Sequence, residues 1–147
     1  MQKHTHKETG CIVTTNPARK PSDKALIAPL IRDQYRRFRE SSRIGDEQSA
    51  WQALEWEHIL SQPFTGAHFA SHWHMLQYAI ELRDWREATG QAMRLLLVPL
   101  GSLTGRLPAG NSGRARVSAF EPMPIPPELH TLIEAAGRED QRSDHAL

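Results

Sequence analysis

The amino-acid sequence predicts an all-α protein: two tandem helical hairpins, about four helices, wrapped by a Gly/Pro-rich C-terminal segment and followed by a short last helix. Three observations support this fold class. Apolar residues recur at helical spacing across residues 24–98. The two halves of that region superpose at an offset of 38 residues. Residues 101–127 are instead dense in glycine and proline, which excludes long regular elements there.

The first predicted helix spans residues 24–42. Its apolar residues fall at positions i, i+4 and i+7, namely Ile31, Tyr35 and Phe38. Gly45 ends this helix, because glycine readily takes the left-handed conformation that follows a helix C-terminus. Asp46 then caps the second helix, which runs to about Leu60, because the aspartate side chain can accept from free backbone N–H groups.

The third predicted helix spans residues 66–83 and carries two neighbouring stripes at helical spacing. One stripe is Phe69, Trp73, Leu76 and Ile80, and the other is His68, His72, Met75 and Ala79. Together they predict one broad inward face. Asp84 and Glu87 form a D-x-x-E capping box that opens the fourth helix. Pro99 and Gly101 are expected to end it.

The offset of 38 residues indicates that the two hairpins are repeats. It pairs Ile31 with Phe69, Tyr35 with Trp73, Phe38 with Leu76, Asp46 with Asp84, and Ala50 with Ala88. Small residues such as Ala53 and Ala92 allow the helices to approach closely, as in tetratricopeptide-like repeats. Two such units are fewer than the roughly three that normally stand alone, so another segment must cover the exposed flank.

That segment is predicted to be residues 101–127, whose scattered apolar residues require burial although no long helix can form. We expect an ordered wrap over the helices, followed by a short helix at residues 128–136. Residues 1–23 are polar, lack any period and read as a disordered N-terminal arm. Residues 137–147 read as a mobile tail, which leaves a single helical domain at residues 24–136.

Composition excludes several classes of function. With 147 residues and 39% hydrophobic content, the chain is long enough for one domain with a core. A formal net charge of +1 gives no electrostatic case for binding nucleic acid or a membrane surface. No apolar run approaches the ~20 residues that a membrane span needs. The single cysteine, Cys11, fits a reducing compartment, so we expect a cytoplasmic protein.

The sharpest chemical signal is a group of histidines on the second and third predicted helices. His68 and His72 stand at i and i+4, so both imidazoles can converge on one ion. If the two helices form an antiparallel hairpin, His58 comes level with them. Glu55 and Met75 are the nearest fourth ligands, of which glutamate suits zinc and methionine suits copper(I). The sequence thus predicts a transition-metal site, with zinc and copper both open.

The alternative is that these histidines are structural and bond to Glu55, Glu57 or backbone carbonyls. The protein would then be a tetratricopeptide-like interaction module that presents Trp56 and Trp85 to a protein partner. His74 falls on the far side of its helix and is expected at the surface. Neither a catalytic base nor a nucleophile with its activating histidine is recognisable, which favours a non-enzymatic role.

Four motifs add a family resemblance. They are L-E-x-x-H-I-L at Leu54–Leu60, H-x-x-x-H-W-x-M-L at His68–Leu76, G-R-L-P-x-G-N-S-G at Gly105–Gly113 and P-M-P-I-P at Pro122–Pro126. Together they resemble a bacterial domain of unknown function, family 3703, over about Pro29–Leu129. The resemblance implies a small helical protein encoded near heavy-metal resistance and transport genes. His58, His68 and His72 match that family's histidine pattern, whereas His74 does not.

Overall fold

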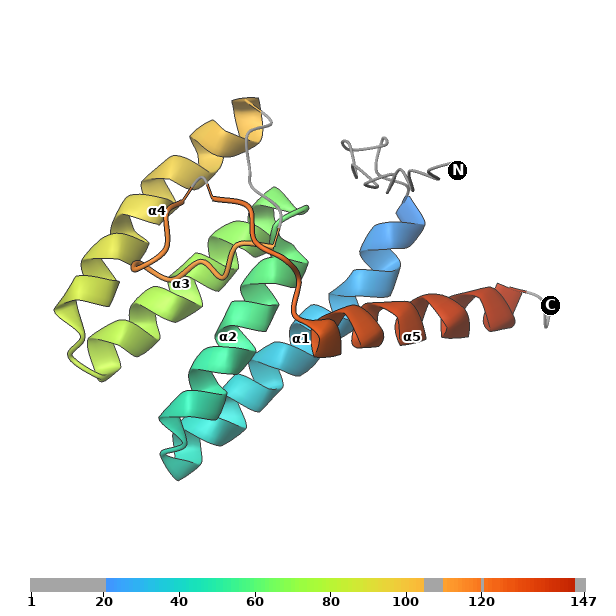
Figure 1. Cartoon of the computed structure of the whole chain (residues 1–147), viewed down its shortest axis with the longest axis horizontal. Helices are drawn as coiled ribbons and strands as arrows, with labels where there is room; N and C mark the ends of the chain where they lie inside the picture. The colour runs from blue at the N-terminus through green and yellow to red at the C-terminus, as the bar shows by residue number, and fades with distance from the viewer. Residues whose placement is uncertain (1–20, 105–109, 120, 145–147) are drawn as a thin grey trace, which may run out of the picture.

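The computed structural model describes residues 21–104, 110–119 and 121–144, and within these ranges it contains five helices and no strand. The helices are α1 (Pro21–Ile44), α2 (Glu47–Ser61), α3 (Thr65–Glu81), α4 (Trp85–Thr104) and α5 (Pro127–Asp144) (Figure 1). The prediction of an all-α protein is confirmed. None of the described helices is long and apolar enough to cross a membrane. The arm predicted at residues 1–23 lies almost entirely outside the described residues.

Three helices extend beyond their predicted bounds. α1 begins at Pro21 rather than at residue 24 and contains Pro29, α4 continues past Pro99 to Thr104, and α5 continues past residue 136, through Gly137, to Asp144. The predicted boundaries at these residues are therefore wrong. Both prolines are exposed, so water can bond to the backbone carbonyl that each leaves without a helical partner. A glycine inside a helix costs only about 1 kcal/mol relative to alanine, which does not stop α5.

Two helical hairpins form the body of the molecule. α1 packs against α2, α3 packs against α4, and α2 joins the two pairs by packing against α3 (Figure 1). The core between them contains Phe38, Ala50, Trp51, Ala53, Leu54, Met75, Tyr78, Ala79 and Ala88. The alanines in that set leave little side-chain volume between the helix axes, so the hairpins can approach closely. The tandem hairpins agree with the prediction, and the closer tetratricopeptide likeness stays a prediction.

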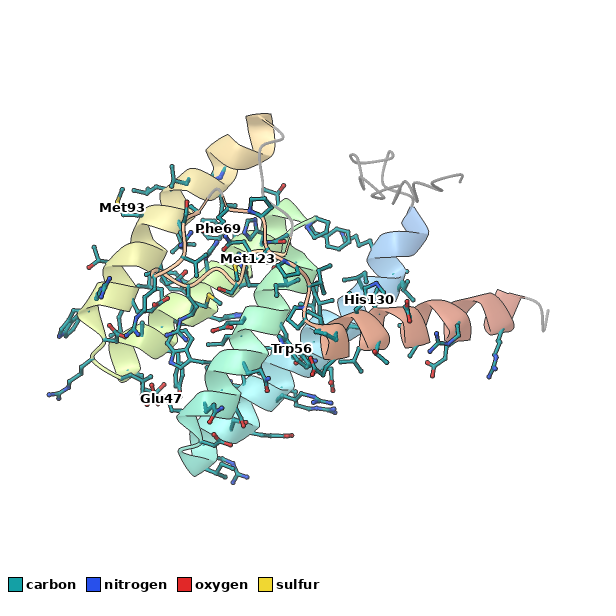
Figure 2. All side chains as sticks on the ribbon, viewed as in Figure 1. Glu47, Trp56, Phe69, Met93, Met123 and His130 are labelled. Atoms are coloured by element: carbon teal, nitrogen blue, oxygen red, sulfur yellow. The ribbon has the colours of Figure 1, made fainter. Side chains whose placement is uncertain are left out.

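A second apolar cluster attaches α5 to α1 and α2. Leu129 is fully buried against Ile59 and Leu60. Trp56 packs against the same cluster and lies near the start of α5 (Figure 2). The expectation that Trp56 is a free contact residue is therefore wrong, because α5 covers that side of α2.

The structure contradicts part of the inward face that was predicted for α3. Phe69, Trp73 and Ile80 are 43%, 48% and 47% exposed. The buried residues of α3 are instead His68, Ser71, His72, Met75, Tyr78 and Ala79. Apolar periodicity alone misassigned the stripe, because polar residues can be buried when each finds a hydrogen-bond partner. The histidine stripe is therefore the one that faces the rest of the molecule.

Alanine substitutions at a buried and at a half-exposed tryptophan should have different effects on stability. Trp51→Ala removes a side chain that is only 6% exposed and should lower the free energy of unfolding by about 3–4 kcal/mol. Trp73→Ala removes a half-exposed side chain and should cost no more than about 1 kcal/mol. Urea unfolding followed by circular dichroism measures both. Equal losses in the two variants would contradict this assignment of faces.

A segment without regular secondary structure, residues 110–119, crosses the face formed by α2, α3 and α4 (Figure 1). We call it the covering loop. Arg94 of α4 donates to the backbone oxygens of Arg114 and Val117. A Cβ at Gly90 would lie 2.2 Å from that of Ala115, so the loop rests directly on α4. This loop is the central part of the ordered wrap predicted at residues 101–127, of which 105–109 and 120 lie outside the described residues.

Candidate metal centre

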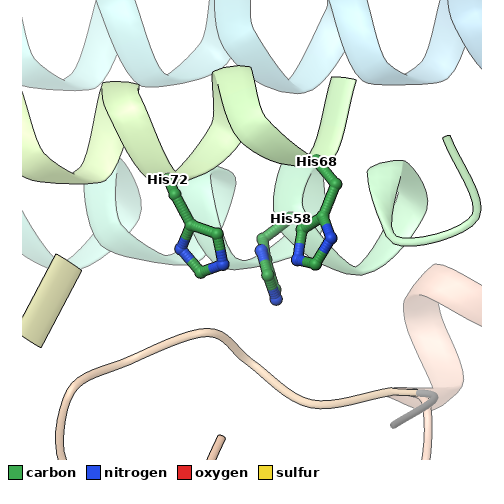
Figure 3. A group of neighbouring side chains, drawn as sticks. All are labelled: His58, His68 and His72. Carbon is green, nitrogen blue, oxygen red and sulfur yellow. The ribbon is translucent and has the colours of Figure 1, made fainter. Parts of the chain in front are cut away.

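Three histidines meet between α2 and α3 (Figure 3). One ligand nitrogen from each of His58, His68 and His72 lies within 4.8 Å of the others. The ring centroids are 4.7 Å apart for His58 and His68, 4.5 Å for His58 and His72, and 4.9 Å for His68 and His72. The side chains converge because His68 and His72 are one turn apart on α3 while α2 folds back alongside. The predicted convergence is confirmed.

The three rings are covered. Their residues are 2%, 4% and 3% exposed, in chain order. The covering loop passes over them (Figure 3), and a Cβ at Gly113 would lie 2.7 Å from Cδ2 of His58. Gly113 has φ +79°, a left-handed conformation that glycine takes without strain. Only glycine therefore allows this backbone to approach the imidazole of His58 so closely.

Each ring has a different set of neighbours. Nδ1 of His58 lies 3.2 Å from Oγ of Ser71, and Nδ1 of His72 lies 2.7 Å from Oε1 of Gln91. Nε2 of His58 lies 3.4 Å from Nε2 of Gln62. Nδ1 of His68 is buried and has no hydrogen-bond partner among the described residues. One buried imidazole nitrogen of the three rings is thus left without a partner among the described residues.

Burial keeps these imidazoles neutral. Desolvation lowers the pKa of His58 well below its ordinary value of 6.5, and the two neighbouring histidines and Arg94 lower it further. Desolvation likewise lowers the pKa of His68 to about 4, with a contribution from Arg94. The pKa of His72 falls to about 3, again through desolvation, against an opposing hydrogen bond to Oε1 of Gln91. At neutral pH all three rings therefore keep a lone pair that a metal can bind.

A charged network surrounds the histidines. Glu87 is 1% exposed and accepts from Nε2 of Gln91 at 2.7 Å and from the backbone N–H of Ala115 at 3.0 Å. The guanidinium of Arg114 lies 3.3 Å from Glu87 Oε2 and 3.6 Å above the ring of Trp51. This network ties the covering loop to α2 and α4, because Ala115 and Arg114 of the loop contact the buried side chains of Glu87 and Trp51.

The two predicted fourth ligands lie in other surroundings. Glu55 Oε1 accepts from Nη1 of Arg114 at 3.4 Å, and Glu55 is not among the residues that share the 4.8 Å group. Burial raises the pKa of Glu55, and Arg114 opposes that rise. Met75 is fully buried in the core cluster with Trp51 and Leu54. A ligand role for Glu55 or Met75 stays a prediction.

His74 is not on the open surface. Its Nδ1 lies 2.9 Å from Oε1 of Glu57, and its ring stacks on Tyr35 at a centroid distance of 4.2 Å. The prediction for His74 is therefore wrong, because Tyr35 of α1 and Glu57 of α2 contact its ring. The pairing of Glu57 with a histidine does occur as the structural alternative expects, but with His74 rather than with the converging three.

Sequence reasoning missed the polar residues that hold the site. Gln91 is fully buried, and Gln62, Ser71 and Asn111 are buried with it. Asn111 donates to the backbone oxygens of Ser118 and Glu121, which folds the covering loop on itself. One signal was present in the sequence: Gln91 follows Glu87 by one turn on the face of α4 that Ala88 and Leu95 mark as inward.

A family model described as "Protein of unknown function (DUF3703)" matches residues 25–133. The chain belongs to this family. No curated protein matches the chain, and no solved structure does. The match to DUF3703 spans all three histidines and the whole covering loop, and it ends within α5. The family description carries no activity, so the function of this DUF3703 protein has to be argued from its site.

Proposed function

We propose that this DUF3703 protein binds a transition-metal ion through the imidazoles of His58, His68 and His72. The observation that carries the proposal is the meeting of three buried imidazoles whose ligand atoms lie within 4.8 Å of one another. Neutral imidazole is the commonest protein ligand for such ions, and burial holds all three rings neutral.

The spacing fits an ion after a small adjustment. Two nitrogens that bind one ion at about 2.1 Å lie about 3.4 Å apart in tetrahedral geometry. Rings whose nitrogens lie within 4.8 Å reach that distance by small side-chain rotations.

We propose zinc or copper as the ion, in a sensor, chaperone or scavenger that acts in the cytoplasm. Three imidazoles suit zinc with water at the fourth position, and they also suit copper(I). Glu55 would complete a zinc site only by leaving Arg114. Met75 would complete a copper(I) site only by leaving the apolar core. The three histidines therefore form the proposal's minimal ligand set.

Calorimetric titration of metal-free, untagged protein tests the proposal. We expect one zinc or copper(I) ion per chain and complete loss of that site in the His68→Ala, His72→Ala double variant, because one imidazole cannot chelate. His130→Ala is the control, since the side chain of His130 is 60% exposed on α5. Undiminished binding in the double variant would refute the site.

Thermal melts give a second readout of the same variants. A ligand at about 100 times its dissociation constant stabilises the fold by about 2.7 kcal/mol, or about 5–10 °C in melting temperature for a chain of this size. A chelator should remove that gain from the wild type and from His130→Ala, and leave the double variant unaffected. A wild type that responds to neither chelator nor metal would contradict metal binding.

A second candidate function is protein interaction, and one observation favours it. Phe69, Trp73 and Ile80 expose about half of their area on one side of α3, and Trp85 at the start of α4 is 64% exposed. Large exposed apolar side chains often mark interaction surfaces. These residues are exposed whereas the three histidines are buried, so replacing Trp73 and Trp85 with serine should abolish partner binding while the metal titration stays unchanged.

A further inference from the structure

The side-chain amide of Gln91 has a fixed orientation. Its Nε2 lies 2.7 Å from the Glu87 carboxylate oxygen Oε1 and 2.8 Å from the backbone oxygen of Gly113. Both partners can only accept, so the NH₂ group must face them. Exchanging the amide atoms would place oxygen against two oxygens. Oε1 of Gln91 is therefore the atom that faces Nδ1 of His72 at 2.7 Å.

An amide oxygen next to Nδ1 fixes the tautomer of His72. Since Oε1 of Gln91 accepts only, Nδ1 of His72 must carry the hydrogen and donate it. A neutral imidazole has one N–H, so Nε2 of His72 keeps the lone pair. Glu87 thus acts on His72 through Gln91, because the carboxylate orients the amide and the amide orients the ring.

His58 reaches the same tautomer through a different partner. The single hydroxyl hydrogen of Ser71 points to the backbone oxygen of His68 at 2.8 Å. Oγ of Ser71 is then an acceptor toward Nδ1 of His58, which lies 3.2 Å away and must carry the hydrogen. Nε2 of His58 therefore keeps its lone pair.

Gln62 independently indicates the same tautomer of His58. Its Oε1 accepts from the backbone N–H of Gly110 at 2.9 Å, and its Nε2 donates to the backbone oxygen of Asn111 at 3.1 Å. The NH₂ group therefore faces Nε2 of His58, at the long distance of 3.4 Å. A donor at that place requires a lone pair on His58 Nε2, in agreement with the hydrogen bond to Ser71.

We propose that Gln91 and Ser71 are positioning residues that hold His72 and His58 as Nδ1–H tautomers, so that both rings bind the ion through Nε2. This inference rests on the proposed metal binding and specifies its ligand atoms. Partners of this kind commonly orient metal-binding histidines and raise the basicity of the ligand nitrogen. The ion displaces the weak contact from Gln62, which stays attached to the covering loop through Asn111 and Gly110.

Nitrogen-15 NMR of metal-free wild-type protein tests the tautomers directly and needs no variant. We expect Nδ1–H and an unprotonated Nε2 for both His58 and His72, and binding of zinc should shift Nε2 while Nδ1–H stays protonated. An Nε2–H tautomer on either ring would overturn the inference. The expected tautomers in a protein that binds neither zinc nor copper(I) would uphold the hydrogen-bond assignment and refute the proposed function.

The variant Gln91→Met tests whether Gln91 positions the ring of His72. Gln91→Met keeps the side-chain length but removes the acceptor, so the His72 resonances should show mixed tautomers and zinc affinity should fall about 10- to 100-fold. Gln77→Met, on the exposed side of α3, is the control and should change neither. Wild-type zinc affinity with an unchanged His72 tautomer in Gln91→Met would overturn the role of Gln91. Should that variant not fold, the wild-type spectrum still decides.

Discussion

Metal-free protein should lose stability steeply as the pH falls below about 6.5, the pKa of an unfolded histidine. Burial depresses the pKa of His68 to about 4 and that of His72 to about 3, and it depresses the pKa of His58 strongly. Between pH 6.5 and 4 the unfolded chain therefore binds protons that the folded chain does not. The stabilising contribution is complete above pH 6.5 and is lost as the pH decreases through this window.

Each histidine contributes up to about 1.4 kcal/mol per pH unit to the slope of the free energy of unfolding against pH. The three together therefore approach about 4 kcal/mol per pH unit. Urea unfolding at a series of pH values measures the slope. His72→Gln should remove about a third of it, because one titrating group is lost. His130→Gln, at an exposed position of α5, should leave it unchanged. A stability that is flat from pH 7 to 5 would contradict the burial of three neutral rings.

Gly113→Val should be a severely damaging substitution in the covering loop. A valine at φ +79° is strained in its backbone, and its Cβ would lie 2.7–2.9 Å from three ring atoms of His58. Neither strain can relax without moving the loop away from the histidines. We expect a loss of more than about 4 kcal/mol in the free energy of unfolding, together with loss of the proposed metal site.

Two other glycines separate the causes of that loss. Gly45 has φ +77° and open space around it, so Gly45→Val measures the backbone strain alone. Gly66, in the first turn of α3, has open space and no positive φ, so Gly66→Val measures the effect of valine without either strain. If Gly113→Val costs no more than Gly45→Val, the close contact between the loop and His58 is refuted. Urea unfolding and zinc titration of the three variants provide the comparison.

Local chemistry in the sequence was sufficient to predict the helices and the meeting of the histidines. Asp46 caps α2 by accepting from the backbone N–H of Ser49, and Asp84 bonds the N–H of Glu87 at the start of α4, as their spacing indicates. The separation of His68 and His72 by one turn places both on one face. The short turn before α3 then brings His58 to the same place, because helical rise is constant.

Contacts between segments far apart in the chain were not predictable in this way. Which stripe of α3 faces inward depends on partners such as Gln91 and Ser61, which satisfy the buried polar groups. The same holds for His74, whose burial depends on Tyr35 of α1. The path of the covering loop depends on buried side chains of α2 and α4. The spacing of apolar residues predicts none of these contacts, since it describes only one helix at a time.

The covering loop also sets an order of assembly. Gln62 bonds to Asn111 across 49 residues and Glu55 to Arg114 across 59, whereas each hairpin joins helices that are neighbours in the chain. Closing long loops is slower than forming local contacts, so the hairpins should form first and the loop should dock last. Between those steps the three imidazoles stand open to solvent. An ion would then enter before the loop docks, and its exchange in the finished protein would proceed at the rate at which the loop opens.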